Sequence, residues 1–313
     1  MKDFAHIPVM LEECIKGLNI KHDGVYFDGT VGGGGHSFEI LKSSSPNGRL
    51  IATDLDDDAI SAAKRRLTRF DGRFEIYKSD YKNYADVLDR AGVERLDGAI
   101  LDFGVSSYQL DCGDRGFSYM KPDAPLDMRM DRSARFDAAE LLNTYPQQQI
   151  AKILKDYGEE KFACEIARNV CAARESKPLE TCGEFADIIE RSIPKKFRQN
   201  GPCARKSFQA VRIAVNGELE GLYDCVLGLT RRLNKGGRIA ILTFHSLEDR
   251  IVKQAFRMLE CDCICDKSLP VCVCGKKQEI NIITKKPVTA GLKEIAVNPR
   301  SKCAKLRIAE KIT

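Results

Sequence analysis

The sequence predicts an α/β fold in which a doubly wound sheet of mostly parallel strands is interrupted by an all-helical insertion. Short β-branched runs alternate with helical patterns in the first third of the chain and return near its end, which is typical of α/β domains. From about Cys112 to Arg205 only helical patterns and proline-punctuated loops occur. We therefore expect a discontinuous α/β domain at 1–111 and 206–313, with a helical insertion at 112–205.

The expected elements follow from periodicity in chain order. The expected strands are Val25–Asp28, Arg49–Asp54, Phe74–Lys78, Gly98–Asp102, Arg238–Phe244, Ile280–Ile283 and Lys305–Ala309. The expected helices of the α/β domain are Ser37–Leu41, Asp58–Phe70 and Leu247–Leu259. Those of the insertion are Asp137–Asn143, Gln147–Lys155, Glu159–Arg174 and Cys182–Arg191.

Composition favours an ordinary enzyme of the cytoplasm. The N-terminus has no apolar signal-peptide region, and no stretch approaches the ~20 apolar residues that span a bilayer. Thirteen cysteines without a secretion signal favour reduced thiols over a disulfide framework. The net charge is only +5, but 191–206 holds six basic residues and no acid, and 276–313 holds ten basic residues against three acidic ones. Such clusters suit a polyanion or a solvated surface.

A glycine-rich loop, Asp28–His36, lies between the first expected strand and its helix. Glycines let a backbone approach a ligand closely. A dinucleotide site needs G-x-G-x-x-G, but counting from Gly32 the third glycine is replaced by Ser37. Asp28 would also repel a pyrophosphate, whereas it could pair with the ammonium of S-adenosylmethionine. The loop therefore favours that cofactor, although a flexible turn is the simpler alternative.

Polar residues end the neighbouring strands. Asp54 ends the second strand, Tyr81 follows the third, and Asp102 ends the fourth. Open α/β sheets bind ligands at the carboxyl ends of their strands, and an acidic residue at such a place can accept both ribose hydroxyls. Any one of these residues could instead cap a helix, and the run from Asp56 to Asp58 is expected to contain such a cap.

Eight ordered strings along nearly the whole chain resemble the RsmH (MraW) family, whose members methylate the N4 atom of a cytosine in small-subunit (16S) ribosomal RNA. They are His6–Met10, Asp28–His36, Leu101–Ser107, Arg115–Ser118, Pro125–Met130, Phe208–Ile213, Phe244–Arg250 and Asn298–Arg300. The resemblance implies a Rossmann-like methyltransferase domain, S-adenosyl-L-methionine as cofactor, and small-subunit ribosomal RNA or the assembled subunit as partner, with no membrane and no DNA.

The resemblance also implies the cofactor contacts. By position they are Gly34, Gly35, His36, Asp54, Tyr81, Asp102 and Gln109. The residue before Gln109 is Tyr108, where many relatives carry proline, so the position of Gln109 is the least secure. Amine methyltransferases often carry Asp-Pro-Pro-Tyr after the fourth strand, whereas here Asp102 is followed by Phe-Gly-Val. We expect Asp102 to be the catalytic residue, by orienting the base or the cofactor.

Two further features leave alternatives open. His245 could act as a base, but a structural role is favoured, with Ser246 as a helix N-cap and Asp249 completing a capping box. The cysteines Cys261, Cys263, Cys265, Cys272 and Cys274 could hold a structural zinc or be reduced thiols in a loop. Because C-x-C is not the usual zinc spacing, no metal ligand is assigned.

The insertion is expected to supply RNA contacts, because it mixes aromatic and basic side chains. The candidates are Arg115, Phe117, Tyr119, Arg129, Lys195, Lys196, Phe197, Arg198, Arg205 and Lys206. The alternative is a helical lid that touches no RNA. For the whole chain, the competing functions are an NAD-dependent oxidoreductase and a non-catalytic RNA-binding protein of ribosome assembly.

Overall fold

The computed structural model describes residues 8–106, 109–110, 113–200, 203–266 and 271–313. These residues form two compact units. The first contains the chain up to Gly104 and again Leu219–Thr313, and the second is Val105–Glu218. The second unit extends beyond the insertion placed at 112–205, because helix α10 (Ala204–Asn216) packs on α7 (Gln147–Gly158) inside it.

One sheet with strand order β3-β2-β1-β4-β5-β8-β6 forms the centre of the first unit. β1 to β5 pair in parallel, while β8 runs antiparallel to β5, and β6 and β7 pair antiparallel with β8. The strands are β1 (Val25–Asp28), β2 (Arg49–Asp54), β3 (Phe74–Lys78), β4 (Leu96–Asp102), β5 (Leu233–Thr243), β6 (Ile280–Ile282), β7 (Val288–Thr289) and β8 (Lys305–Lys311). The predicted strands are confirmed, and among the strands of the described residues only the two-residue β7 lacks a sequence signal.

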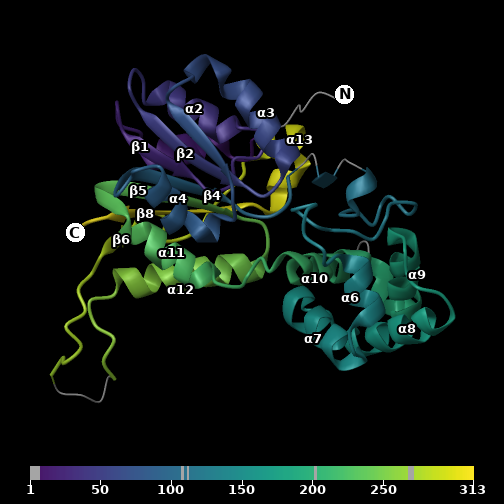
Figure 1. Ribbon diagram of the computed structural model, residues 1–313. Coiled ribbons are helices and arrows are strands. Elements are labelled where there is room, and N and C mark those ends of the chain that lie inside the picture. The colour runs from purple at the N-terminus through teal and green to yellow at the C-terminus, as the bar shows by residue number, and fades with distance from the viewer. Residues whose placement is uncertain (1–7, 107–108, 111–112, 201–202, 267–270) are drawn as a thin grey trace. The chain divides into compact units, whose positions relative to one another are not determined.

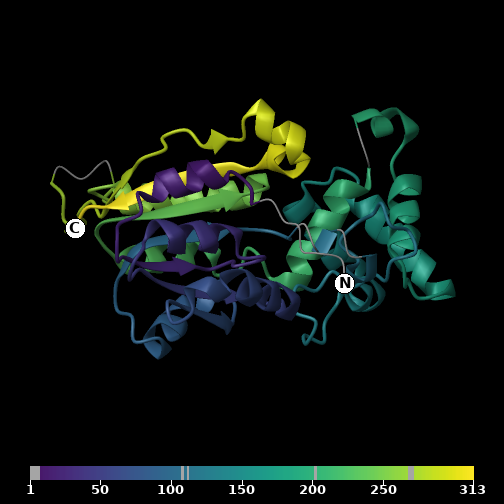
Figure 2. The same ribbon diagram turned by 90° about the horizontal axis from the view of Figure 1, so that it is seen from above.

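Helices cover both faces of this sheet, as Figures 1 and 2 show. Successive strand residues point to opposite faces, so Tyr26 packs in one core and Phe27 in the other. The first core receives α1 (Leu11–Leu18), α2 (Gly35–Ser43) and α3 (Asp57–Leu67). The second receives α4 (Tyr84–Arg90), α11 (Leu222–Arg231) and α12 (Ser246–Glu260). The doubly wound fold class is therefore confirmed.

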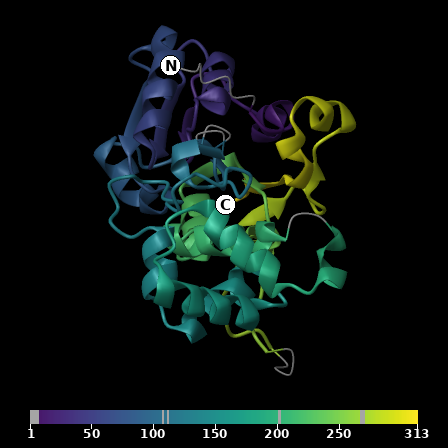
Figure 3. The same cartoon turned by 90° about the vertical axis from the view of Figure 1, so that its right-hand side faces the viewer.

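The second unit is a helical bundle with its own core, seen as the teal to green helices of Figure 3. Its helices are α6 (Ala138–Thr144), α7, α8 (Ala163–Ser176), α9 (Cys182–Ser192) and α10. Asp137 caps α6, and Thr181 with Glu184 forms a capping box on α9, which fixes where these helices begin. Among the residues described in this unit, the only β pairing is an isolated bridge between Pro125 and Thr181.

Short elements complete the fold. They are α13 (Leu292–Val297) and the 3₁₀ helices Thr68–Phe70, Tyr81–Asn83, Gly113–Arg115, Lys195–Asn200 and Pro299–Cys303. Over the part of the chain that the structure describes, no helix has both the length and the apolar character needed to cross a membrane.

Candidate functional site

Three carboxylates end neighbouring parallel strands of the first unit. Asp28 is the last residue of β1, Asp54 of β2 and Asp102 of β4. The order of the strands reverses between β1 and β4, since β2 and β3 lie on one side of β1 and β5 lies beyond β4. Ligands of open α/β sheets bind at such a reversal, outside the carboxyl ends of the strands. The fold therefore brings these three carboxylates to the edge where a ligand is expected.

Asp28 fixes the glycine loop through hydrogen bonds to its first residues and to α2. Its side chain is 2% exposed and accepts hydrogen bonds from the Ser37 hydroxyl at 2.6 Å and from the Thr30 N–H at 3.1 Å. Burial, reinforced by the nearby charge of Asp54, raises its pKa to about 6. Ser37, which occupies the place of a dinucleotide site's third glycine, thus has a polar role that glycine could not perform.

The loop brings its backbone close to α3. Gly34 has a φ of +74°, and a Cβ there would lie 3.2 Å from the Cα of Ala63. This is a left-handed conformation that a side chain would strain, in a place without room for one. Gly35 is the first residue of α2, and a Cβ there would overlap the ring of Pro8. The two glycines predicted to contact a cofactor are therefore required by the local packing.

The His36 ring connects the loop to β4. Its Nε2 lies 3.1 Å from the carbonyl oxygen of Val9, and its Nδ1 lies 3.8 Å from Oδ2 of Asp102. The carbonyl can only accept, so Nε2 is assigned the proton, which leaves Nδ1 of the neutral ring as an acceptor facing the carboxyl group.

Asp102 lies at the end of β4, and its carboxyl group has the pKa that departs most from the usual value among the three carboxyl groups of the site. Burial raises its pKa to about 8, with further contributions from the negative charges of Asp28 and Glu248. At pH 7 a group with this pKa is about nine-tenths protonated, so about one-tenth of it is the carboxylate that can accept a proton.

Asp54 is held by backbone donors on both oxygens. Oδ2 accepts from the N–H of Gly32 at 2.8 Å, and Oδ1 accepts from the N–H of Asp56 at 2.9 Å. Burial raises its pKa to about 6, although these hydrogen bonds oppose the shift. Each carboxylate oxygen has a second lone pair, so the group can still accept two hydroxyl donors. The helix cap predicted in the neighbouring acidic run is Asp56, as expected.

Tyr81 and Gln109 occupy different units. Tyr81 begins the 3₁₀ helix after β3, and its ring lies 5.3 Å from that of Phe103, centroid to centroid. A Cβ on Gly29 would lie 2.8 Å from Cβ of Tyr81, so Tyr81 packs beside the glycine loop. Gln109 belongs to the second unit, where its Oε1 accepts from the N–H of Ser106 at 2.9 Å. Its cofactor contact stays a prediction.

His245 has a structural role that differs by one residue from the expected cap. His245, not Ser246, is the N-cap of α12, and Glu248, not Asp249, completes the capping box. Nδ1 of the imidazole accepts a hydrogen bond from the Glu248 N–H at 3.4 Å, in the place of the side-chain oxygen of a Ser or Asp cap. Asp249 instead pairs with Arg307, Nε to Oδ1, at 2.6 Å.

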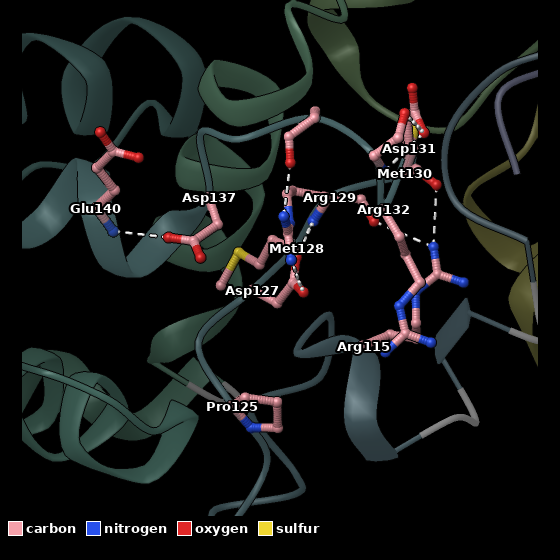
Figure 4. Close-up of polar contacts among 12 residues, drawn as sticks. Arg115, Pro125, Asp127, Met128, Arg129, Met130, Asp131, Arg132, Asp137 and Glu140 are labelled. Carbon is pink, nitrogen blue, oxygen red and sulfur yellow. Dashed lines mark hydrogen bonds and ion pairs between the residues drawn. The ribbon is translucent and has the colours of Figure 1, made fainter.

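Basic and aromatic candidates for RNA contact divide into buried and exposed groups. Arg115 is 1% exposed and donates from Nη2 to the carbonyl oxygens of Arg129 and Met130 at 3.1 and 3.0 Å. Phe117 is also buried. Arg129 makes a two-pronged ion pair with Asp127, with N···O distances of 2.7 and 2.8 Å (Figure 4). The polar network of Figure 4 thus organises the loop ahead of α6.

Five of the candidates present exposed side chains, and Arg198 does not belong with them. The exposed residues are Lys195, Lys196, Phe197, Arg205 and Lys206. Phe197 is 54% exposed, and large aromatic side chains are usually more buried. It follows two lysines in the sequence. Arg198 instead donates from Nε to the carbonyl oxygen of Ile193 at 2.8 Å and pairs with Glu190. We call the five exposed residues the basic patch.

Sequence comparisons with known proteins match nearly the full length of the chain. A model described as the MraW methylase family matches residues 3–312. The ribosomal RNA small subunit methyltransferase H of Clostridioides difficile is 51% identical over 99% of this chain and 100% of its own length. The protein of the same name from Geobacter sp. is 49% identical over 100% of both chains. Among solved structures, an rRNA methylase from Streptococcus thermophilus has a TM-score of 0.39 at 11% identity, covering 97% of this chain and 94% of that one.

Proposed function

Because the chain belongs to the MraW methylase family, we propose that it transfers a methyl group from S-adenosyl-L-methionine to the exocyclic N4 amine of a cytosine in small-subunit ribosomal RNA, in the cytoplasm. The observation that carries the proposal is the set of three carboxylates, Asp28, Asp54 and Asp102, that end adjacent strands around a glycine loop. The RNA substrate is proposed from the names of relatives that are about half identical over their whole length.

The residues present fit this cofactor better than a dinucleotide. Asp54 keeps lone pairs for two ribose hydroxyls. Burial first, and neighbouring carboxylates second, raise the pKa values of Asp28, Asp54 and Asp102. A bound sulfonium and ammonium group would favour the ionised carboxylates. A pyrophosphate would add negative charge to the same place, so an NAD-dependent oxidoreductase is disfavoured.

The chain's own task in the reaction is to position an unreactive amine and to take up its proton. The cofactor supplies a methyl group bonded to a positively charged sulfur. The N4 lone pair of cytosine is delocalised into the ring, so in-line placement against that methyl carbon accounts for most of the rate. As the N–C bond forms, N4 becomes acidic and must lose a proton. We propose that a carboxylate oxygen of Asp102 accepts it.

Asp102 is suited to that role by its surroundings. A carboxyl group with an ordinary pKa would be too weak a base near neutral pH, whereas burial and then the negative charges of Asp28 and Glu248 strengthen this one. The backbone N–H of Asp102 is fixed by the Thr30 hydroxyl at 2.6 Å, and His36 lies beside its carboxyl group. Thr30 and His36 are therefore positioning residues for Asp102.

The second unit is proposed to bind RNA. The basic patch offers four cations for phosphates and the exposed ring of Phe197 for a base, a combination that suits single-stranded RNA. A cytosine must leave its stack for N4 to be reached, so contacts on both sides of the target nucleotide are needed to hold the strand.

The decisive experiment measures transfer of a radiolabelled methyl group to three substrates: purified small-subunit RNA, small subunits from cells lacking the protein, and large subunits as control. Nucleosides from the labelled RNA are then separated and identified by mass spectrometry. We expect label in N4-methylcytidine only, and only with small-subunit substrates. Label at another atom of cytosine, or equal labelling of large subunits, would contradict the proposed acceptor. An absence of label with a protein that binds the cofactor would favour a non-catalytic assembly role.

A further inference from the structure

A long excursion joins α12 to β6 and carries four converging cysteines. It runs from Cys261 to Glu279, and Figures 1 and 3 show it extending away from both elements. Its described parts, 261–266 and 271–279, contain neither helix nor strand. Two Cys-x-Cys arms occur in it, Cys263 with Cys265 and Cys272 with Cys274. Loops of this length without regular structure are uncommon in compact domains unless something organises them.

The four sulfur atoms form one tight group, all lying within 4.8 Å of one another. The Sγ of Cys272 is 3.5 Å from those of Cys263 and Cys274 and 3.9 Å from that of Cys265, and the Sγ atoms of Cys274 and Cys263 are 3.9 Å apart. A tetrahedral zinc with Zn–S bonds of about 2.3 Å has sulfurs about 3.8 Å apart. The observed separations therefore match the edges of a zinc tetrathiolate.

Backbone N–H groups point at these sulfurs from both arms. The N–H of Ile264 donates to Sγ of Cys274 at 3.4 Å, and the N–H of Val273 donates to Sγ of Cys265 at 3.3 Å. Within the first arm, the N–H of Cys265 donates to Sγ of Cys263 at 3.4 Å. Donors of this kind stabilise thiolates, the form that binds a metal.

The fifth cysteine of the motif is separate. Sγ of Cys261 contacts the carbonyl oxygen of Met258 at 3.1 Å, at the end of α12, and it is not a member of the sulfur group. The geometry thus selects four ligands from five neighbouring cysteines, which the C-x-C spacing alone could not do.

We propose that Cys263, Cys265, Cys272 and Cys274 bind one structural zinc ion that holds the two arms together. The four thiols lose their protons and coordinate Zn²⁺ with no oxidation or reduction, so the ion closes a four-coordinate site with no position for a substrate. Disulfides would need sulfurs about 2.05 Å apart, and all four cysteines are unpaired thiols at their observed separations. An iron–sulfur cluster would distribute the four cysteines over two or four irons, so some of the sulfurs would lie farther apart than ligands of one ion.

The need for a metal follows from how little else stabilises the excursion. Ile264, Val271 and Val273 are 53%, 70% and 77% exposed, so these apolar side chains in the described parts of the excursion form no core. A segment that cannot bury apolar surface cannot offset the entropy lost on ordering, and metal coordination is one of the few substitutes.

The test uses the full-length protein purified without added metal and without chelator. We expect about one zinc per chain by elemental analysis, released when a mercurial reagent modifies the thiols. Exchange with cobalt(II) should give intense sulfur-to-cobalt charge-transfer bands and the visible bands of a tetrahedral ion. Cys265→Ser and Cys272→Ser, one from each arm, should lose at least about nine-tenths of the zinc, while the matched control Cys261→Ser should retain it.

Several outcomes would overturn the proposal. They are wild-type protein that takes up neither zinc nor cobalt, stoichiometric iron instead of zinc, disulfides detected by thiol titration and mass, or equal zinc loss in Cys261→Ser. The cobalt spectrum of the wild type does not depend on any variant, so a misfolded variant cannot hide a negative result.

Discussion

The backbone N–H of Asp102 donates a hydrogen bond to the hydroxyl oxygen of Thr30 at 2.6 Å. This bond joins the end of β4 to the loop that follows β1, across the point where the strand order reverses. Two similar bonds fix the neighbouring strands, since the Thr53 hydroxyl donates to the carbonyl oxygen of Gly29 and the Ser79 N–H donates to that of Asp54. The loop and its three carboxylates are therefore held in place before any ligand binds.

Replacing Asp54 with alanine should weaken S-adenosylmethionine binding by about 10–100-fold, the loss expected for hydrogen bonds to a charged group worth about 1.5–3 kcal/mol. Isothermal titration calorimetry measures the affinity. The matched control is Asp57→Ala, which removes an exposed carboxylate three residues away that pairs with Lys78 at the surface. A similar loss in both variants would show that general charge, rather than the position of Asp54, determines binding.

Cofactor affinity should rise with pH between about 5.5 and 7. The pKa values of Asp28 and Asp54 are about 6 in the ligand-free protein, so part of each population is protonated at pH 5.5. A bound cation favours the carboxylates, lowers their pKa values and releases protons, which makes binding tighter as pH rises. We expect about tenfold or more for S-adenosylmethionine over this range.

S-adenosylhomocysteine is the control for that pH dependence, because it carries the same amino group but no sulfonium charge. Its affinity should change less with pH than that of S-adenosylmethionine. Equal pH dependence for the two ligands would place the responsible carboxylates away from the sulfur.

The strands and the carboxylates at their ends were predictable because each is a local signal. A buried β-branched run followed at once by an acid occurs at Asp28, Asp54 and Asp102, and needs no tertiary information to be recognised. Helix α1 was not predicted, since it begins after Met10 in a left-handed conformation without a side-chain cap. Its N-cap residue is a methionine, so the sequence lacks the Ser, Thr, Asp or Asn that usually marks the start of a helix.

Side-chain burial in the second unit was not predictable, because it depends on contacts between residues that are distant in sequence. Arg115 and Phe117 belong to a mixed basic and aromatic stretch that is typical of an exposed surface. Arg115 is buried because the carbonyl groups of Arg129 and Met130, distant in sequence, accept its hydrogen bonds, and a buried cation is tolerated only with such partners. The cysteine group behaves similarly, because the selection of four sulfurs depends on how two arms fold together.

Asp102→Asn should lower the rate of methyl transfer by at least about 100-fold, the usual contribution of a general base, while cofactor binding persists. The same change should stabilise the fold. The folded pKa of about 8 exceeds the unfolded value, so the wild-type free energy of unfolding falls as pH rises from about 4 to 8, and Asn escapes this loss. The gain in Tm over wild type should therefore be larger at pH 8.5 than at pH 5, by about 2–4 °C or more.

Asp97→Asn, on the same strand, is the control of opposite sign. Asp97 is partly desolvated, but hydrogen bonds from the Val25 N–H, Lys21 and Asn234 keep its pKa below the usual value. Its ionised form stabilises the fold at neutral pH, so Asn should lower Tm there and the loss should shrink as pH falls toward the folded pKa. Equal responses of both variants would show that the charge at Asp102 is not destabilising.

Gly34→Ala should reduce both stability and cofactor affinity. The residue has a φ of +74° and a Cβ would lie 3.2 Å from backbone of α3. Gly72 offers a matched control, because its φ of +78° carries the same conformational cost with no atom within 4 Å of the added Cβ. Both variants should lose about 1–2 kcal/mol from the left-handed backbone, measured by denaturant unfolding. Only Gly34→Ala should lose more than that and also weaken cofactor binding.

Charge reversal in the basic patch should weaken RNA binding and reduce its dependence on salt. Lys195 and Lys196 are the better choices, because Arg198 joins its 3₁₀ helix to the end of α9 through Ile193 and Glu190 and its loss would also disturb the fold. Each lost phosphate contact lowers the slope of log K against log salt by about 0.7–0.9. The double change to glutamate should therefore flatten the slope by about 1.4–1.8, in filter-binding measurements with small-subunit RNA. Cofactor affinity should stay unchanged.

The matched double variant, Lys64→Glu with Arg65→Glu, makes the same net-charge change on exposed positions of α3. If both pairs flatten the slope equally, RNA responds to overall charge rather than to the basic patch, and the second unit loses its proposed role.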